Sequence, residues 1–105
     1  MLRITNERKI YAWREPVDMR KSFEGLIAVT TNALEEDPLS GSIFLFHNRA
    51  SNYVKLLLWD RTGYVLYAKK LERGKFKIFL EAQKQIINEQ QLSFLLDGIA
   101  IGRRA

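Results

Sequence analysis

Apolar and polar positions alternate along the middle of the chain, which predicts a small β-sheet. The segments SIFLFH (residues 42–47), YVKLLLWD (53–60) and YVLYAKKL (64–71) are rich in β-branched, aromatic and aliphatic residues. They are separated by the turn sequences NRASN and RTG, so the three strands should form an antiparallel meander over residues 43–71. KIYAWR (9–14) and FKIFL (76–80) are predicted as two further short strands.

The segment after the first strand has a helical periodicity instead. Side chains that can be buried recur three or four positions apart at Met19, Phe23, Leu26, Ile27, Thr30 and Leu34. This spacing predicts one amphipathic helix over residues 18–35, with Asp18 placed to cap its first turn. Gly25 lies inside this helix at a cost of about 1 kcal/mol relative to alanine, so we expect it to mark close packing on the sheet.

A second, shorter helix is predicted near the C-terminus, in NEQQLSFLLDG. Asn88 is a good N-cap, Gln91 completes an approximate capping box, and Gly98 suits the position after the last turn. The buried side is a stripe of leucines, namely Leu92, Leu95 and Leu96. The helix is therefore expected over residues 89–97.

Together these elements predict an α+β fold in a single domain, residues 1–105. We expect a small antiparallel sheet of about four to five strands, packed against the helix 18–35, with the short helix 89–97 beside it. A chain of 105 residues, 47% of them hydrophobic, can bury one modest core, and no second domain is expected. The pattern does not determine the order of the strands.

If Trp59 pairs with Tyr64 across the RTG turn, the central hairpin has two different faces. One face mixes rings and lysines with aliphatic side chains: Tyr53, Lys55, Leu57, Trp59, Tyr64, Leu66, Ala68 and Lys70. The other is mainly aliphatic: Val54, Leu56, Leu58, Val65, Tyr67 and Lys69. We expect the helix 18–35 to cover the aliphatic face. The mixed face suits nucleic acid, whose bases stack on rings and whose phosphates attract ammonium groups, and it equally suits a protein interface.

Positive charge is concentrated in the same region. The formal net charge is +5, and residues 49–77 alone contain eight basic and two acidic residues, a net of +6. The remaining residues contain nine basic and ten acidic ones, a net of −1. Such regional basicity is typical of a surface that faces a polyanion. Exposed lysines also serve solubility and discourage edge pairing of strands, so charge alone leaves both interpretations open.

Few side chains suggest catalysis or metal binding. The absence of cysteine excludes disulfides, thiolate nucleophiles and cysteine-based metal sites. The single histidine, His47, is interpreted as structural. Asp18, Asp37 and Asp60 could share metal ions only if they converged, and each has a local role in a cap or a turn. No nucleotide-binding or hydrolase motif occurs, so we expect no enzyme activity, no cofactor and no metal.

The N-terminal sequence does not have the pattern of a secretory signal. MLRITNERKIYAWRE mixes charged and apolar residues, and no later apolar run approaches transmembrane length. We therefore expect a soluble cytoplasmic protein with no membrane partner.

The order of several motifs resembles one known family. VDMRKSFEGL, DPLSGSIFLFHNR, the strand of Lys55 that ends in Trp59-Asp60, and Gly63 followed by KKLERGKF occur in sequence over about residues 9–76. This arrangement resembles the accessory protein called TnpB or Orf2 of the insertion sequence 66 family of bacterial transposons, and QQLSFLLDGI fits its usual ending. The resemblance implies a small bacterial protein, encoded beside the transposase of a mobile element, that assists transposition and DNA recombination. It implies no defined biochemical activity and no catalytic residue.

The motif of the family can be carried over residue by residue. It falls on Asp18, Met19, Arg20, Lys21, Gly25, Asp37, Pro38, Ser40, Gly41, Phe44, Asn48, Arg49, Lys55, Trp59, Asp60, Gly63, Lys70, Leu71, Glu72, Gly74 and Phe76. The chain departs from the pattern where residues 50–53 replace a more basic turn, and where Lys70 replaces the usual arginine before Leu-Glu. Both departures weaken the case for strong phosphate binding at the hairpin, because each replaces or omits basic residues of the family pattern. The order of the motifs is unchanged.

Two functions fit these observations. The leading hypothesis is a non-catalytic transposition accessory protein that contacts DNA, mainly at phosphates, through the basic hairpin 49–77. The charges would come from Arg20, Lys21, Arg49, Lys55, Lys69, Lys70, Arg73 and Lys75, and Tyr53, Trp59 and Tyr64 would stack or form an interface. The alternative is a protein-interaction module that docks on the transposase of the element without contacting DNA. Sequence specificity, stoichiometry and the step of transposition are not predicted.

Overall fold

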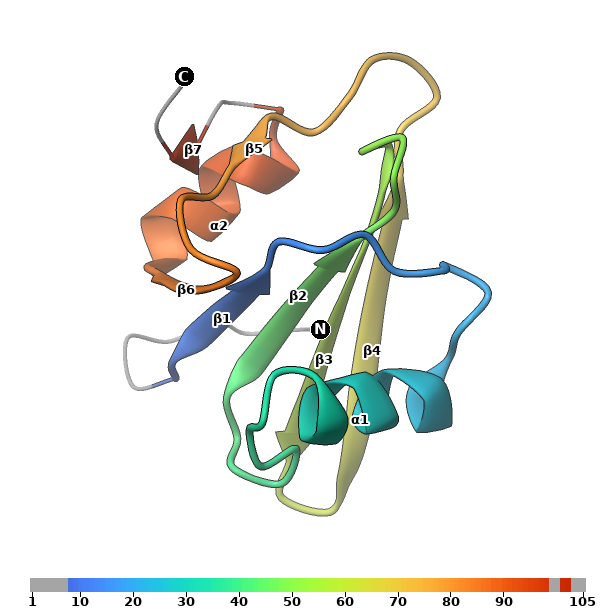
Figure 1. Cartoon of the computed structure of the whole chain (residues 1–105), viewed down its shortest axis with the longest axis vertical. Coiled ribbons are helices and arrows are strands. Elements are labelled where there is room, and N and C mark those ends of the chain that lie inside the picture. Colours follow the sequence, from blue (N-terminus) through green and yellow to red (C-terminus); the bar gives the residue numbers. More distant parts are fainter. Residues whose placement is uncertain (1–7, 99–100, 103–105) are drawn as a thin grey trace.

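The chain folds into a mixed arrangement of strands and helices (Figure 1). The computed structural model describes residues 8–98 and 101–102. In chain order the elements are β1 (Ile10–Trp13), α1 (Phe23–Asn32), β2 (Ile43–His47), β3 (Tyr53–Asp60), β4 (Gly63–Lys70), β5 (Ile78–Phe79), β6 (Lys84–Ile87), α2 (Glu89–Leu96) and β7 (Ile101–Gly102). The predicted α+β class is confirmed.

The main sheet has five strands in the order β4-β3-β2-β1-β6. Strands β2, β3 and β4 form the predicted antiparallel meander. Strand β1 lies parallel to β2, which is possible because the long connection through α1 carries the chain back along the sheet. Strand β6, which the sequence pattern did not predict, pairs antiparallel with β1. Strand β5 lies within the predicted segment 76–80 and pairs with β7 in a separate two-stranded sheet.

The register of the central hairpin is the one expected from the sequence. Trp59 lies opposite Tyr64, and the pairing continues without a bulge to Tyr53 opposite Lys70. Side chains therefore alternate between the two faces as predicted, because a strand has a period of two residues.

The helices cover the two faces in the opposite way to our expectation. Leu26 of α1 packs with Phe44 and Leu57, on the face that also carries the hairpin's rings and lysines. Leu92 and Leu95 of α2 pack on the aliphatic face. All five residues of β2 are buried, so the sheet needs a cover on both faces, and each helix supplies one. The prediction that the helix 18–35 covers the aliphatic face was wrong.

The N-terminal boundary of α1 also differs from the prediction. The helix begins at Phe23, so Asp18 is not its N-cap. Asp18 Oδ1 instead accepts a hydrogen bond from the backbone N of Arg20 at 2.9 Å, in a turn that precedes the helix. The Lys55 ammonium donates to the carbonyl oxygens of Met19 and Lys21 at 2.8 Å each. The carbonyl oxygens of Met19 and Lys21 thus bond to a side chain of β3 and not to backbone N–H groups of a helical turn. Residues 18–21 therefore remain outside α1.

The other end of α1 shows why the periodic pattern ran too long. The helix ends at Asn32, and Glu35 adopts a left-handed φ of 57° that turns the chain. Leu34 is buried although it lies beyond the helix, so the apolar spacing in the sequence continues past the end of α1.

An added Cβ at Gly25 would lie 3.0 Å from Cβ and Cγ of Lys21. The atoms nearest to this position belong to a side chain of the same segment, so the glycine makes room for Lys21.

Helix α2 agrees with its sequence signature. Asn88 Oδ1 accepts from Gln91 N at 2.7 Å, and Gln91 Oε1 accepts from Asn88 N at 2.9 Å, which completes the capping box. Gly98 has a φ of 84° directly after the helix. None of the helices in the described residues is long and apolar enough to span a lipid bilayer.

Candidate nucleic-acid interface

Three segments meet at one end of the main sheet, which we call the basic end: residues 16–21, 48–53 and 70–77. Val17 N donates to His47 O at 2.8 Å, which joins the first segment to the end of β2. Leu71 N donates to Asn52 O at 2.8 Å and Phe76 N to Ser51 O at 2.6 Å. The turn before β3 and the loop after β4 therefore lie side by side (Figure 1).

Asn48 organises the turn between β2 and β3. Its Oδ1 accepts from the backbone N of Asn52 at 3.0 Å and of Tyr53 at 3.1 Å, and its Nδ2 donates to Asn52 Oδ1 at 2.7 Å. These side-chain bonds take the place of the backbone hydrogen bonds that residues in a strand would form with a neighbouring strand. Within this turn Ser51 adopts a left-handed φ of 56°. The turn thus holds Arg49 and Tyr53 in fixed positions relative to the sheet.

Four of the predicted basic residues are exposed on the turn before β3, at the end of β4 and on the loop after it: Arg49, Lys70, Arg73 and Lys75. Lys70 Nζ lies 5.7 Å from the centroid of the Tyr53 ring, at a distance typical of a cation–π contact. Arg49, Arg73 and Lys75 form no ion pair or side-chain hydrogen bond with any residue that the structure describes. Their charges are available to an external anion.

Two other predicted basic residues are engaged inside the fold. Lys55 is only 8% exposed, and its ammonium is the donor to Met19 O and Lys21 O described above. Lys69 Nζ donates to Leu96 O at 2.6 Å, at the C-terminus of α2, where the helix dipole favours a cation. These two charges hold segments together, and we leave them out of the proposed binding surface.

Arg20 and Lys21 lie beside the exposed cations, in the segment that leads into α1. The Arg20 guanidinium binds both carboxylate oxygens of Asp18, with Nη2 2.6 Å from Oδ2. These hydrogen bonds, together with the one from Arg20 N, lower the pKa of Asp18 from its ordinary value of 3.8 to about 2. The Asp18 charge therefore offsets that of Arg20. Lys21 is exposed, and its stem lies across Gly25.

The three predicted stacking residues lie at two different places. Tyr53 is half-buried at the basic end. Trp59 and Tyr64 lie at the opposite end of the hairpin, where their rings pack edge to face with centroids 5.1 Å apart. Only Tyr53 is thus placed next to the exposed cations.

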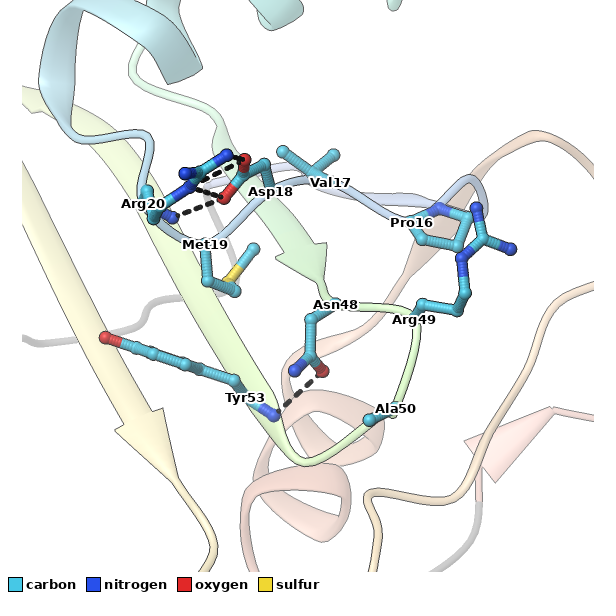
Figure 2. A pocket seen from close by; sticks show the side chains of 9 residues that line it. All are labelled: Pro16, Val17, Asp18, Met19, Arg20, Asn48, Arg49, Ala50 and Tyr53. Carbon is cyan, nitrogen blue, oxygen red and sulfur yellow. Dashed lines mark hydrogen bonds and ion pairs between the residues drawn. The ribbon is translucent and has the colours of Figure 1, made fainter.

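A pocket of about 520 Å³ opens in the basic end. It is lined by Pro16, Val17, Asp18, Met19, Arg20, Asn48, Arg49, Ala50 and Tyr53. Figure 2 shows Arg20 and Arg49 on opposite sides, with Met19 and Asn48 between them. The pocket therefore combines an aromatic ring and a thioether with two guanidinium groups. It forms only where segments about thirty residues apart in sequence come together.

His47 and the three aspartates have local structural contacts. The His47 ring nitrogens lie 2.9 Å from Arg14 O and 3.0 Å from Asn48 O, so the ring joins the ends of β1 and β2. Asp37 Oδ1 accepts from Leu39 N at 2.9 Å, and Asp60 pairs with Arg8 at 3.4 Å. In residues 8–98 and 101–102, no three His, Cys, Asp or Glu side chains are grouped to hold a metal ion. The aspartates therefore do not converge.

Sequence reasoning missed the apolar part of this site. Pro16 and Val17 were given no role in a site and Met19 was interpreted as a core position of the helix, yet all three line the pocket. The proline disfavours helix at the residue before it, but nothing nearby in sequence shows that this segment faces Tyr53.

Fold and site define a small α+β domain with a group of exposed basic side chains at one end of its main sheet. The family model described as IS66 Orf2 like protein matches residues 8–105, and the chain belongs to this family of proteins associated with transposition. The resemblance seen in the motifs is therefore confirmed.

Two similar proteins come from Sinorhizobium fredii (strain NBRC 101917 / NGR234). Uncharacterized protein y4jC is 38% identical over 68 residues, which cover 65% of this chain and 58% of y4jC. Uncharacterized protein y4hO is 36% identical over 83 residues, which cover 78% of this chain and 72% of y4hO. The match to y4jC thus spans less than two thirds of that protein. No solved structure gives a significant match.

Proposed function

We propose that this protein is a non-catalytic accessory protein of transposition that binds DNA phosphates through its basic end. Family membership supports the association with transposition. The observation that carries DNA binding is that Arg49, Arg73 and Lys75 are exposed on adjacent loops with no ionic partner among the described residues. At the opposite end of the sheet, Arg8 already donates to Gly41 O and pairs with Asp60.

Clustered, unpaired cations bind the regularly spaced phosphates of DNA and release condensed counterions. Together with Lys70, these residues would neutralise about four phosphates, which corresponds to a slope of about −3.5 in a plot of log affinity against log salt. Phosphate contacts carry no sequence information, so we propose binding without strong sequence preference. The site of action would be the bacterial cytoplasm, where the DNA of the element lies.

The test is binding to labelled duplex DNA, measured by fluorescence anisotropy from about 50 to 200 mM salt. The test variant is Arg73→Glu/Lys75→Glu. The matched control is Lys9→Glu/Arg61→Glu, which changes the net charge equally but at exposed residues of the opposite end. We expect the test variant to bind at least about tenfold more weakly with a slope smaller by about 2, whereas the control keeps the wild-type slope. Circular dichroism checks that both are folded.

If both variants lost the same affinity for duplex DNA, the binding would depend on the net charge of the protein and not on the basic end. Absence of binding by the wild-type protein at about 50 mM salt would refute the proposal. The second candidate, docking on the transposase without DNA contact, would then take its place. It is favoured by the half-buried Met19 and Tyr53 of the pocket, since aromatic residues and methionine are enriched in protein interfaces.

A further inference from the structure

The pocket of the basic end has the size and composition of a small-molecule site. Its volume of about 520 Å³ falls in the range of roughly 300–1,000 Å³ that is typical of such sites. One part of its wall is apolar and aromatic, from Met19 and Tyr53, and another carries the guanidinium groups of Arg20 and Arg49. A ligand with a flat ring at one end and an anion at the other would match both parts.

We infer that this pocket holds one unpaired nucleotide of DNA, with its base against Tyr53 and its phosphate near Arg49. The protein would then prefer single-stranded DNA, or duplex ends with unpaired nucleotides, over blunt duplex DNA. This inference rests on the proposed DNA binding and adds the kind of DNA that is recognised.

The base must be unpaired because of where Tyr53 lies. In a duplex, both faces of an internal base are covered by its neighbours, so a side chain within a pocket cannot stack on it. Tyr53 is half-buried and lines the pocket, and the ammonium groups of Lys55 and Lys70 lie 5.6 and 5.7 Å from the centroid of its ring, so the ring forms part of the pocket wall. An unstacked base can enter and lie against this ring, and the Met19 thioether makes favourable contacts with aromatic systems.

The phosphate side of the site depends on Arg49 and Lys70. Arg49 has no ionic partner among the described residues, and its planar guanidinium can bind two phosphate oxygens at once. Lys70 is exposed beside the Tyr53 ring and can reach the phosphate of an adjoining nucleotide. Arg20 is bound to Asp18 through three hydrogen bonds between their side chains, so it shapes the pocket and adds little net charge.

The experiment compares two DNA hairpins with equal numbers of phosphates, one blunt and one with a 3′ single-stranded thymidylate extension. Because both hairpins carry the same number of phosphates, a difference in affinity between them cannot come from a difference in total charge. We expect the wild-type protein to bind the extended hairpin about tenfold more tightly. Tyr53→Leu should bring the ratio of the affinities for the two hairpins to about one, whereas Tyr53→Phe should keep the preference for the extended hairpin. Tyr64→Leu, which removes a half-buried ring of the same sheet face at the opposite end, is the matched control and should also keep it.

A fluorescent base analogue gives a second readout that needs only the wild-type protein. With 2-aminopurine in the unpaired extension, stacking on Tyr53 should change the fluorescence on binding, and the same base in the paired stem should not respond. Equal affinity of the wild-type protein for both hairpins would overturn the inference and leave phosphate binding intact. A preference that persists in folded Tyr53→Leu would overturn the assignment to this pocket. Failure to bind either hairpin would overturn the proposed function as well.

Discussion

Replacing Lys55 by methionine should lower the free energy of unfolding by about 2–3 kcal/mol. The side chain is 8% exposed, and its ammonium donates to Met19 O and Lys21 O at 2.8 Å each. A hydrogen bond from a charged group contributes about 1.5–3 kcal/mol, so the two bonds contribute about 3–6 kcal/mol. Methionine keeps most of the apolar stem and needs no desolvation of a charge, which offsets part of the loss.

The assay is urea denaturation followed by tryptophan fluorescence. With a denaturant slope of about 1.5 kcal/mol per molar, the unfolding midpoint should fall by about 1.3–2 M. Lys70→Met is the matched control, because Lys70 is on the same sheet face but exposed, and should change stability by less than about 1 kcal/mol. A Lys55→Met variant within about 0.5 kcal/mol of wild type would refute the reasoning that these bonds hold residues 19–21 on the sheet.

Two further predictions concern a helix cap and an exposed carboxylate. Asn88→Ala should destabilise the protein by about 1 kcal/mol, measured by the same urea titration, because it removes the acceptor for Gln91 N, and Asn88→Asp should restore most of the loss. The pKa of Asp18 is lowered from 3.8 to about 2 by its hydrogen bonds with Arg20, so this carboxylate stabilises the fold above its unfolded pKa and ceases to do so as pH falls from about 4 to about 2. The thermal midpoint of wild type should therefore fall more than that of Asp18→Asn over this range, and identical pH profiles would contradict the assignment.

The elements that the sequence predicted well are those with local signals. The turn sequence RTG sets the Trp59–Tyr64 register, and the spacing of Asn88 and Gln91 sets the start of α2. In both cases the residues that determine the structure are close in the chain, so the pattern contains the whole signal.

The start of α1 shows where local signals fail. Asp18 has the right identity and position for a cap, but Lys55, which is 36 and 34 positions away from its acceptors Met19 and Lys21, takes their carbonyl oxygens. A tertiary hydrogen bond with a charged donor outweighs the helix propensity of about four residues, since each residue contributes only a fraction of a kcal/mol.

The candidate site shows the same division. Lys55, Lys69, Lys70 and Lys75 belong to one basic segment and cannot be ranked from sequence. In the fold, the first two donate to backbone carbonyls and the last two are exposed. Whether a charge is available to a ligand depends on which partners the fold brings near it.

The sequence by itself determined the α+β class, the antiparallel meander, the capped C-terminal helix and the concentration of positive charge in residues 49–77. Only the tertiary structure decided the parallel β1–β2 pairing, the face that each helix covers, and the pocket that joins residues 16–20 to Tyr53. The physical reason is that periodicity, turns and caps depend on neighbours along the chain. Strand order, helix docking and the freedom of a charge depend on contacts between distant segments, and these are chosen by burial and hydrogen bonding of the whole fold.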